Sequence, residues 1–576
     1  MTGFKIEEIS LSHLVRGGLI IQDERLQNWP VVYALSDEKH VYVGETLNFI
    51  ARVGQHLLSE EKKKLRVARI VLDDTFNKSV CLDLESYLIR LLAGDGKFQV
   101  MNLNDGITDA NYFDRSRYRE LFLEICERLR EQGLFAKTTS EIENSDLFKL
   151  SPFKALNMDQ IVSVRTLLGN LIVDMASKTT SASVIRGDPG TGKTIVAIFL
   201  IKLLRDIAVA EIDDGLTADS PFAEFFTPRN RNLLEKVRVG LVIPQQSLRC
   251  SVQKVFKSTP NLKQSMVMSP FQVGESPWRF DVLIVDETHR LGQRANQSSG
   301  PLNKKFATIN VSIFGNDDNE HTQLDWIEKK SDHQIYLLDP AQSIRPADLP
   351  IHKQEALIRS AKDSDHYFEL NSQMRVRGHG DYIGYIRSLL SFEPPPSRLE
   401  FPDYELRLFD DIHRFRSEII RRDTEVGLSR VVAGFAWPWK SKKNQKAFDI
   451  EIDGLGLRWN SSPVDWINSP SSRYEVGSIY TVQGYDLNFA GVIIGPDLRY
   501  DPKTKRLLAD RQSYFDVKGK ENNARLGITY TDDDLLVFLT NIYGVLLTRG
   551  ILGTYVYVCD INLRSYFRQF MDSQEF

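Results

Sequence analysis

The sequence predicts an α/β protein with about three domains. At 576 residues the chain exceeds what a single hydrophobic core usually organises. A glycine-rich loop at 187–194 lies between a short apolar run and a segment with apolar residues at helical spacing, which predicts a strand–loop–helix unit. Apolar runs at 280–285 and 334–338 each end in polar residues, as buried parallel strands do when their carboxyl ends carry a site.

The composition is that of a soluble globular protein. The formal net charge is −4, so nucleic-acid binding would need local basic patches instead of an overall positive charge. The cysteines at 81, 126, 250 and 559 form no closely spaced pair, which fits a reducing compartment. No apolar run is long enough to span a bilayer, and residues 1–20 lack the order of a secretory signal. We therefore expect a cytoplasmic protein without a membrane partner.

The first 114 residues predict a lead-in and a small α+β domain. We expect residues 1–28 to be a lead-in without chemistry of its own. Two β-rich runs, 31–35 and 41–44, flank a polar turn and predict a hairpin. A helix at 46–58 is expected to carry Arg52 and His56 on one face, followed by a strand at 69–72 and a helix at 82–92 with Glu85.

The hairpin resembles the GIY-YIG nuclease family. Val31-Val32-Tyr33 and Tyr42-Val43-Gly44 are similar to its two tripeptides, although valine stands at position 31 where the family usually has glycine. Arg52, His56, Glu85 and an asparagine follow in the family's order. The resemblance implies a nuclease domain at 29–114 that hydrolyses phosphodiester bonds with a metal ion.

The resemblance also implies roles for these side chains. Glu85 would be the one protein ligand of Mg²⁺ or Mn²⁺, an ion that otherwise keeps water, and Arg52 would clamp the scissile phosphate. Tyr33 or Tyr42 would take the proton from the attacking water, with His56 relaying it; we favour Tyr33 as the base. Asn102 would support the site by hydrogen bonding, with Asn104 as the alternative.

Residues 115–150 are predicted to connect this domain to the rest of the chain. Residues 115–135 have apolar side chains at helical spacing and predict a connecting helix. Residues 137–151 are polar and rich in serine, which is typical of a linker.

The loop at 187–194 matches the phosphate-binding pattern G-x-x-x-x-G-K-[ST]. Gly187, Gly190 and Gly192 would let backbone N–H groups approach a polyphosphate at the helix N-terminus. Lys193 would reach the β- and γ-phosphates, and the Thr194 hydroxyl would hold Mg²⁺. The loop predicts binding of ATP or another nucleoside triphosphate.

Carboxylates follow the apolar run at 280–285. Asp286 would hold Mg²⁺ through water, and Glu287 would orient and deprotonate the water that attacks the γ-phosphate. His289 and Arg290 either couple this site to nucleic acid or serve the structure alone.

Further segments in order resemble superfamily 1 helicases, closest to the branch that includes the Schlafen-type helicase domain. Residues 240–248 resemble the strand and turn that touch single-stranded nucleic acid, residues 334–342 resemble motif III, and residues 480–495 resemble motif V. The resemblance implies that Gln160 reads the adenine edge and that Gln342 senses the γ-phosphate. Arg375 and Arg549 would reach the phosphates, Arg549 as an arginine finger.

The implied fold is two RecA-like parallel-sheet domains, 151–355 and 356–576, with the nucleotide between them. Hydrolysis would close and open that cleft and so move single-stranded nucleic acid. Three segments are predicted as irregular: a surface insertion at 210–232, a long polar loop at 292–333 and a solvated loop at 499–525. Trp437–Lys443 with Trp459 and Trp466 would either stack on bases or pack an insert.

Together the motifs predict a metal-dependent endonuclease fused to an ATP-dependent DNA helicase or translocase, suited to defence against foreign DNA or to DNA repair. Two alternatives stay open: a nucleotide-driven switch whose N-terminal domain only binds DNA, and an enzyme that acts on RNA. Protein partners are not predicted.

Overall fold

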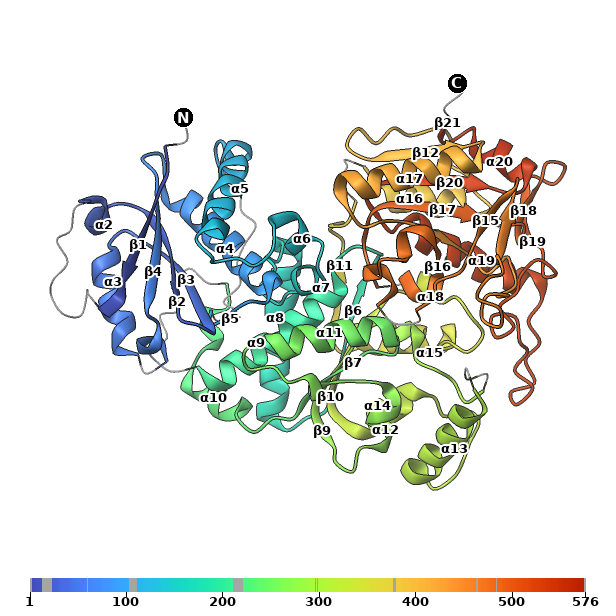
Figure 1. Cartoon of the computed structure of the whole chain (residues 1–576). Helices are drawn as coiled ribbons and strands as arrows, with labels where there is room; N and C mark the ends of the chain where they lie inside the picture. Colours follow the sequence, from blue (N-terminus) through green and yellow to red (C-terminus); the bar gives the residue numbers. More distant parts are fainter. Residues whose placement is uncertain are drawn as a thin grey trace. The chain divides into compact units, whose positions relative to one another are not determined.

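The computed structural model describes residues 3–12, 23–59, 61–102, 111–210, 221–295, 297, 299–376, 380–462, 465–482 and 484–573. The chain divides into two compact units (Figure 1). The first contains Met1–Arg165, Ile198–Lys236 and Ser251–Met266, and the second contains Thr166–Ala197, Val237–Cys250 and Val267–Phe576. Each unit is described by itself.

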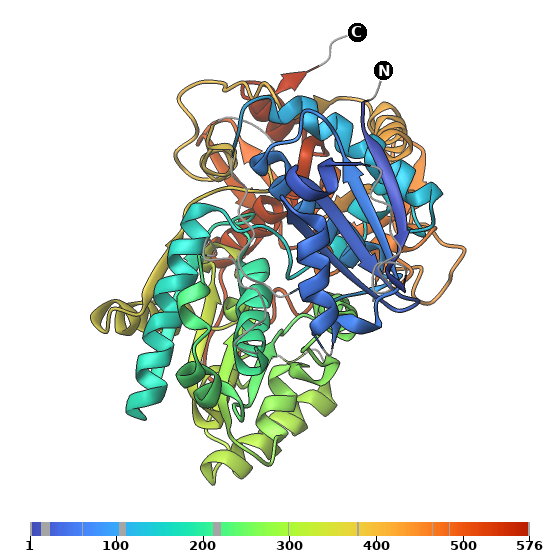
Figure 2. The same cartoon turned by 90° about the vertical axis from the view of Figure 1, so that its left-hand side faces the viewer.

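A five-stranded sheet in the order β1-β4-β2-β3-β5 forms the N-terminal part of the first unit (Figure 2). Its strands are β1 (Lys5–Ser10), β2 (Val31–Ser36), β3 (His40–Thr46), β4 (Val67–Leu72) and β5 (Gln99–Val100). The hairpin of β2 and β3 is antiparallel, as predicted. Residues 1–28 are more than a lead-in, because β1 pairs with β4 along its whole length.

Helices cover both faces of this sheet. Side chains alternate along β2, so that Val32 and Ala34 join a core with α4 (Lys78–Asp95) and α5 (Arg115–Glu131). Val31, Tyr33 and Leu35 join a second core with α3 (Phe49–Leu58). Asn48 and Asn77 cap the N-termini of α3 and α4 by accepting backbone N–H groups. The short helices α2 (Arg25–Asn28) and η1 (Lys62–Lys64) complete this part.

The segment predicted as a linker is folded. Residues 137–151 contain α6 (Thr139–Glu143) and α7 (Asp146–Lys149). Ile142 and Phe148 pack into the core of α4, where a Cβ on Gly94 would lie only 2.7 Å from the Phe148 Cβ. Gly94 therefore allows the close approach, and the serines and acids of the segment serve as helix caps instead of a flexible tether.

Much of the insertion predicted at 210–232 lies outside the described residues. The part that is described contains η2 (Ala223–Phe225) and α10 (Pro228–Leu234), and Phe222 is buried against Phe199.

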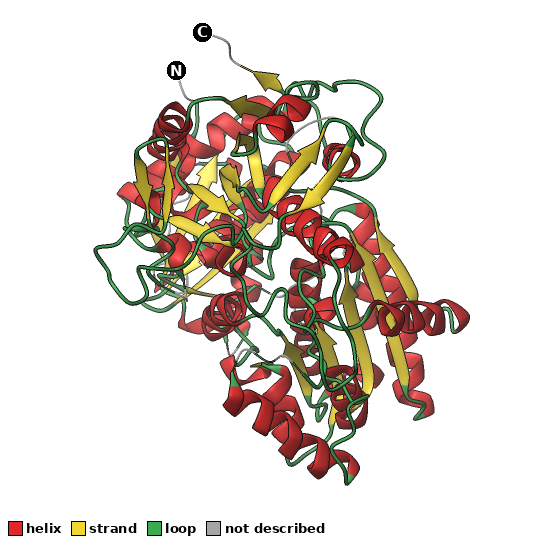
Figure 3. Ribbon diagram, turned by 90° about the vertical axis from the view of Figure 1, so that its right-hand side faces the viewer, coloured by secondary structure: helices red, strands yellow, loops and turns green. Residues whose placement is uncertain are grey.

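The second unit contains a parallel sheet in the order β11-β6-β10-β9-β7-β8 (Figure 3). Its strands are β6 (Ser181–Gly187), β7 (Val239–Val242), β8 (Val267–Met268), β9 (Phe280–Val285), β10 (Ser331–Leu338) and β11 (Tyr367–Leu370). Because β11 pairs with β6, this sheet continues past the predicted boundary at 355. Helix α8 (Met158–Ser177) precedes the first of these strands. The chain between the strands forms, among other helices, α9 (Lys193–Val209), α11 (Gln246–Ser258), η3 (Gln264–Met266), α12 (Pro270–Glu275) and α15 (Ile351–Asp363).

The polar segment 292–333 is not one long loop. It forms α13 (Gly300–Phe314) and α14 (Gln323–Lys330). The rings of Phe306 and Trp326 lie 4.2 Å apart in a small core with Ile309, and Trp326 Nε1 donates to Asn310 Oδ1 at 2.7 Å. The polar residues that suggested a loop lie at the caps and on the outer faces of these helices.

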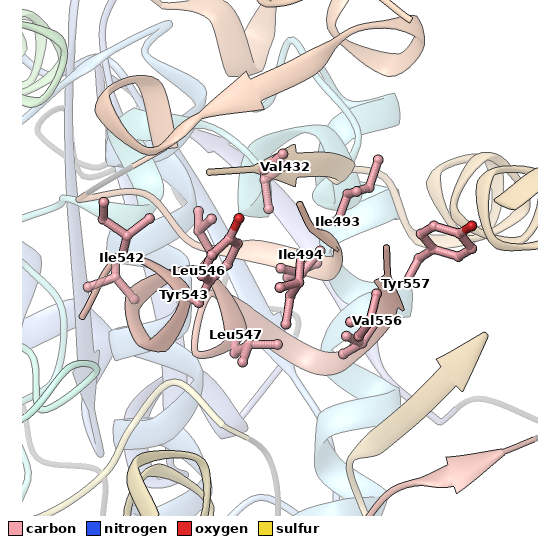
Figure 4. Close-up of a cluster of buried hydrophobic side chains, with 14 of the residues drawn as sticks. Val432, Ile493, Ile494, Ile542, Tyr543, Leu546, Leu547, Val556 and Tyr557 are labelled. Atoms are coloured by element: carbon pink, nitrogen blue, oxygen red, sulfur yellow. The ribbon is translucent and has the colours of Figure 1, made fainter. Parts of the chain in front are cut away.

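A second parallel sheet has the order β16-β13-β17-β20-β12-β21. Its strands are β12 (Glu405–Phe409), β13 (Ser429–Ala433), β16 (Val476–Ser478), β17 (Leu487–Ile494), β20 (Gly550–Val558) and β21 (Asp572–Ser573). The helices of this domain are α16 (Tyr382–Leu389), α17 (Ile412–Val426), α18 (Ile479–Val482), α19 (Asp532–Leu547) and α20 (Ile561–Phe567). Apolar residues of α19 face the centre of this sheet (Figure 4).

Smaller elements are added to the second sheet. They are the hairpins β14 (Ile450–Ile452) with β15 (Leu455–Leu457) and β18 (Leu498–Asp501) with β19 (Arg506–Ala509), and the turns η6 (Trp466–Asn468) and η7 (Ser472–Tyr474). The turns η4 (Thr288–Arg290) and η5 (Pro340–Gln342) follow β9 and β10 of the first parallel sheet. The segment 499–525 is therefore only partly a solvated loop, since Tyr514 is fully buried. Among the described residues, no helix has the length and apolar character needed to cross a membrane.

Candidate functional site

The loop between β6 and α9 lies in the second unit and has the backbone shape that its glycines permit. Gly190 and Gly192 have φ angles of +86° and +80°, which favour glycine. The Lys193 ammonium donates to the carbonyl oxygens of Gly187 at 2.6 Å and Asp188 at 3.1 Å. It also lies 3.9 Å from Asp339 Oδ2. The ammonium is thus held against the carbonyl oxygens at the start of the loop and close to the Asp339 carboxylate.

Thr194 and Asp286 meet, although 92 residues separate them. The Thr194 hydroxyl donates to Asp286 Oδ2 at 2.7 Å. Asp286 is fully buried at the end of β9, and burial together with the adjacent Glu287 carboxylate raises its pKa to about 6. Hydroxyl and carboxylate oxygens are the ligands that Mg²⁺ prefers, usually with several waters. A divalent cation would also favour the ionised form of Asp286, so these residues fit such an ion.

Glu287 follows Asp286 in a backbone conformation that is rare for side-chain-bearing residues, with φ +51°. His289 Nε2 lies 3.0 Å from Glu287 Oε2. The backbone N–H of Asp339 points at His289 Nδ1 at 3.4 Å, so Nδ1 accepts and Nε2 is the protonated nitrogen. The contact between Nε2 and Glu287 Oε2 is close but is not aligned as a hydrogen bond. Burial by itself raises the pKa of Glu287, but the adjacent imidazole outweighs it and the pKa falls to about 2. Glu287 is therefore an ionised carboxylate. To accept a proton from water, this carboxylate would have to turn from His289 toward the water molecule.

His289 and Arg290, whose roles the sequence leaves open, have different environments. His289 contacts the Glu287 carboxylate, as described above. Arg290 donates to the buried Asp348 carboxylate at 3.1 Å, which indicates a structural ion pair. Arg290 therefore has a structural role, whereas coupling of His289 to nucleic acid stays a prediction.

Arg375 and Arg549 are brought close to this centre. Arg375 Nε pairs with Asp486, and its NH1 donates to the Thr548 carbonyl at 3.2 Å. Arg549 is almost fully buried, and its NH1 donates to the Tyr485 carbonyl at 3.2 Å. Burial, and then the like charge of Arg375, lower the pKa of Arg549 to about 9, while Glu287 among other acids opposes the shift. Two cations thus share a buried region beside the carboxylates.

Three polar side chains close the loop from other elements. Gln342 Nε2 donates to Asp339 Oδ2 at 2.6 Å. The same carboxylate oxygen lies 3.9 Å from the Lys193 ammonium, so Asp339 connects the residue expected to sense a phosphate with Lys193. Arg387 on α16 donates to Asp188 Oδ1 at 2.8 Å and lies 3.7 Å from Asp339 Oδ1. Gln373 Nε2 donates to the Pro189 carbonyl at 2.6 Å. No motif in the sequence pointed to Arg387 or to this role of Gln373.

Gln160 belongs to the first unit, so its position relative to the loop is not described. Its side-chain oxygen accepts the Asn157 N–H at 3.1 Å, while its own N–H donates to Asn157 Oδ1 at 2.8 Å. This reciprocal pair caps the start of α8. The adenine-reading role stays a prediction.

The segment expected to touch single-stranded nucleic acid, 240–248, lies beside the segment that resembles motif V within the second unit. Gln245 Nε2 donates to the Tyr480 carbonyl at 3.1 Å, and the Tyr485 hydroxyl donates to the Ser247 carbonyl at 3.1 Å. The turn after β7 therefore contacts the segment around α18.

A second candidate site lies in the first unit, on the α3 face of its sheet. The Tyr33 hydroxyl and His56 Nε2 are 2.8 Å apart. The Tyr42 ring centroid lies 4.7 Å from that of His56 and 6.4 Å from that of Tyr33. Tyr33 pairs across the hairpin with Gly44, where a Cβ would lie 2.6 Å from the Tyr33 Cζ. Glycine at 44 therefore leaves the room that the phenol ring occupies.

The electrostatics of this cluster favour a neutral imidazole. Burial, then Lys62 and Arg52, lower the pKa of His56 to about 3. Burial raises the pKa of Tyr33, which Arg52 opposes and Glu85 enhances. The Lys62 ammonium lies 4.2 Å from the Tyr42 ring centroid, a contact that the sequence did not suggest. The predicted residues Tyr33, Tyr42, Arg52, His56 and Glu85 thus influence one another in space.

Asn102 has a clear structural task beside the tyrosines. Its side chain donates to the Val43 carbonyl at 2.8 Å and accepts the Val43 N–H at 3.1 Å. This pair fixes β3 between Tyr42 and Gly44, which matches a supporting role. Asn104 lies outside the described residues.

The tryptophans of the second sheet domain pack an insert. Trp459 and Trp466 are fully buried, so for these two the packing alternative holds and base stacking does not. Trp437 and Trp439 are half-buried, with ring centroids 6.5 and 6.0 Å from that of Trp459. Lys442 lies 4.3 Å from the Trp439 ring. Apolar packing of the large rings decides between the two alternatives.

Comparison with known proteins covers the larger part of the chain. Residues 180–560 match the family model "Schlafen group 3, DNA/RNA helicase domain". The chain is also 24% identical over 403 residues to the uncharacterized protein YPL245W of Saccharomyces cerevisiae, covering 66% of this chain and 82% of that protein.

Proposed function

Because the chain belongs to the Schlafen group 3 DNA/RNA helicase family, we propose that its second unit is an ATP-driven motor on DNA and that its first unit is a metal-dependent GIY-YIG endonuclease. The observation that carries the motor is the Thr194–Asp286 contact beside two buried arginines. The observation that carries the nuclease is the Tyr33–His56 hydrogen bond at the hairpin. The alternative substrate is RNA.

In the motor, the triphosphate would lie on the N–H groups of the loop at 187–194. Thr194 and Asp286 would hold Mg²⁺, which neutralises phosphate charge during the reaction. Glu287 would position the attacking water and take its proton, with His289 keeping the carboxylate ionised and oriented. Arg375 and Arg549 would stabilise the charge that develops on the γ-phosphate.

In the nuclease, the cluster of Tyr33 and His56 beside α3, together with Glu85 of α4, would act on a phosphodiester. Tyr33 would take the proton of the attacking water, and the neutral His56 at 2.8 Å would receive it. Arg52 would hold the scissile phosphate with its planar fork. Glu85 would hold a Mg²⁺ or Mn²⁺ ion, which supplies stabilisation of the leaving oxygen.

The simplest coupling is that the motor feeds DNA while the nuclease nicks it. The test is cleavage of plasmid and forked DNA, and of matched RNA, by wild type, Lys193→Ala and Glu85→Ala, with and without ATP and Mg²⁺. We expect Glu85→Ala to abolish cleavage and Lys193→Ala to abolish only its ATP-dependent part. Full nicking without ATP and in Lys193→Ala would reject the coupling.

The same experiment separates the rival hypotheses. DNA affinity that is equal in wild type and Glu85→Ala, without cleavage by either, would favour a nucleotide-driven switch with a DNA-binding domain. Cleavage confined to the RNA substrates would change the substrate class. Affinities are to be compared at one stated salt concentration, because phosphate contacts make binding salt-dependent.

A further inference from the structure

A second glutamate lies on the face of the hairpin that packs against α4. Glu45 is the penultimate residue of the tyrosine-bearing strand β3, and alternation along the strand places it on the same face as Val41 and Val43, which pack against α4. Its side chain is only 9% exposed. One carboxylate oxygen pairs with Lys78, and the other, Oε2, is buried without a hydrogen-bond partner among the described residues.

Glu45 faces the side of α4 that carries Glu85. Lys78, Cys81 and Glu85 are spaced three and four residues apart on this helix, so they share one face. The Cys81 thiol is fully buried, and burial, then Glu45 and Glu85, raise its pKa. Both carboxylates therefore lie within electrostatic reach of one sulfur atom.

A buried carboxylate oxygen without a partner is costly, and a cation removes that cost. Lys78 offsets part of the charge of Glu45, but its side chain is 54% exposed and reaches only one oxygen. Mg²⁺ is commonly held by one or two carboxylates, with water and substrate phosphate as the other ligands.

We propose that Glu45 is a second protein ligand, with Glu85, for the divalent cation of the nuclease site. The inference rests on the proposed nuclease function and adds to it a residue that the family resemblance does not supply. Two carboxylates would bind the ion more tightly than one, and would hold it between the end of β3 and the face of α4. Lys78 would then limit affinity by competing for Glu45.

The test measures metal binding directly, with Mn²⁺ as the probe. The full chain, free of nucleotide and carrying Asp286→Asn to silence the motor's own cation site, is titrated with Mn²⁺ and free Mn²⁺ is read by electron paramagnetic resonance. Glu45→Gln and Glu85→Gln are each expected to weaken binding about tenfold or more. Glu61→Gln, an exposed glutamate of the same domain, is the matched control and should bind as the parent does.

A further variant separates a ligand from an ion pair. If Glu45 binds the ion, Lys78→Met should tighten Mn²⁺ binding, because the competing ammonium is gone. If Glu45 serves only its ion pair, Glu45→Gln and Lys78→Met should both leave Mn²⁺ affinity unchanged, which would overturn the proposal. Thermal unfolding of each variant shows that the comparison is between folded proteins.

Cleavage is measured in a separate assay, so that a failure of the proposed nuclease function can be distinguished from a failure of the proposed second metal ligand. Mn²⁺ binding that depends on Glu45 in a protein that cuts neither DNA nor RNA would retain the metal site and remove the nuclease. Cleavage that needs Glu85 but is indifferent to Glu45, with unchanged Mn²⁺ affinity, would retain the nuclease and remove the second ligand.

Discussion

Replacing Arg549 by methionine should stabilise the nucleotide-free protein and yet disable its motor. Arg549 is fully buried beside Arg375, and one of its guanidinium nitrogens, Nε, has no partner among the described residues. The fall of its pKa from 12.5 to about 9 corresponds to about 5 kcal/mol of unfavourable free energy for the charged form. Methionine keeps most of the apolar volume without the charge, so this figure is the upper limit of the gain.

The lowered pKa of Arg549 also determines how the free energy of unfolding depends on pH. A folded-state pKa below the unfolded one means that the charged arginine opposes folding at neutral pH, and that this opposition fades as pH rises through 9. The stability gain of Arg549→Met should therefore shrink by about 1 kcal/mol between pH 8 and pH 10. Denaturant unfolding at both pH values measures it.

The motor should respond in the opposite direction. Loss of an arginine that stabilises transferring phosphate typically costs 10³–10⁵ in turnover, so ATP hydrolysis by Arg549→Met should fall by roughly 10³ or more. Nucleotide should also stabilise the variant less than wild type in thermal unfolding. A variant that is less stable than wild type at pH 8 and hydrolyses ATP normally would refute the assignment of Arg549 to the site.

Three further predictions concern other parts of the chain. Glu287→Gln should lower ATP turnover about 10²–10⁴-fold while nucleotide still raises the unfolding temperature; lost nucleotide binding would contradict a purely chemical role. Gly44→Ala should lower DNA cleavage at least about tenfold, because the new methyl group displaces Tyr33 from His56; a normal cleavage rate would show that this contact is dispensable. Burial raises the pKa of Asp497 from 3.8 to about 7, so wild type should lose about 4 kcal/mol of stability relative to Asp497→Asn as pH rises from 4 to 8; denaturant unfolding that shows a pH-independent difference would speak against it.

Motifs that are continuous in the sequence could be predicted, whereas contacts between residues far apart in the sequence could not. The loop at 187–194 and the carboxylates after β9 could be assigned because each motif is a continuous stretch whose function requires that residue order. Glu45, Lys62 and Arg387 could not, since each is a single charged residue whose partner lies far away in the sequence.

Secondary structure was missed where polar residues hide a short apolar stripe. In α13, Phe306, Ile309 and Ile313 recur at helical spacing, but the surrounding asparagines and serines suggested a loop. The edge strands β1 and β11 are short and only partly buried, so their sequences carry little of the alternating pattern that marks a strand. Their place in a sheet is decided by distant strands that no local pattern reveals.

The stretch that follows β11 touches the phosphate loop and carries Arg375 within three residues. Gln373 donates to Pro189, the Met374 N–H donates to the Gly190 carbonyl at 2.9 Å, and Arg375 pairs with Asp486 next to the second sheet. The backbone segment that contacts the phosphate loop therefore also carries the arginine that is paired with Asp486, so the loop and Arg375 are connected through one continuous stretch of three residues.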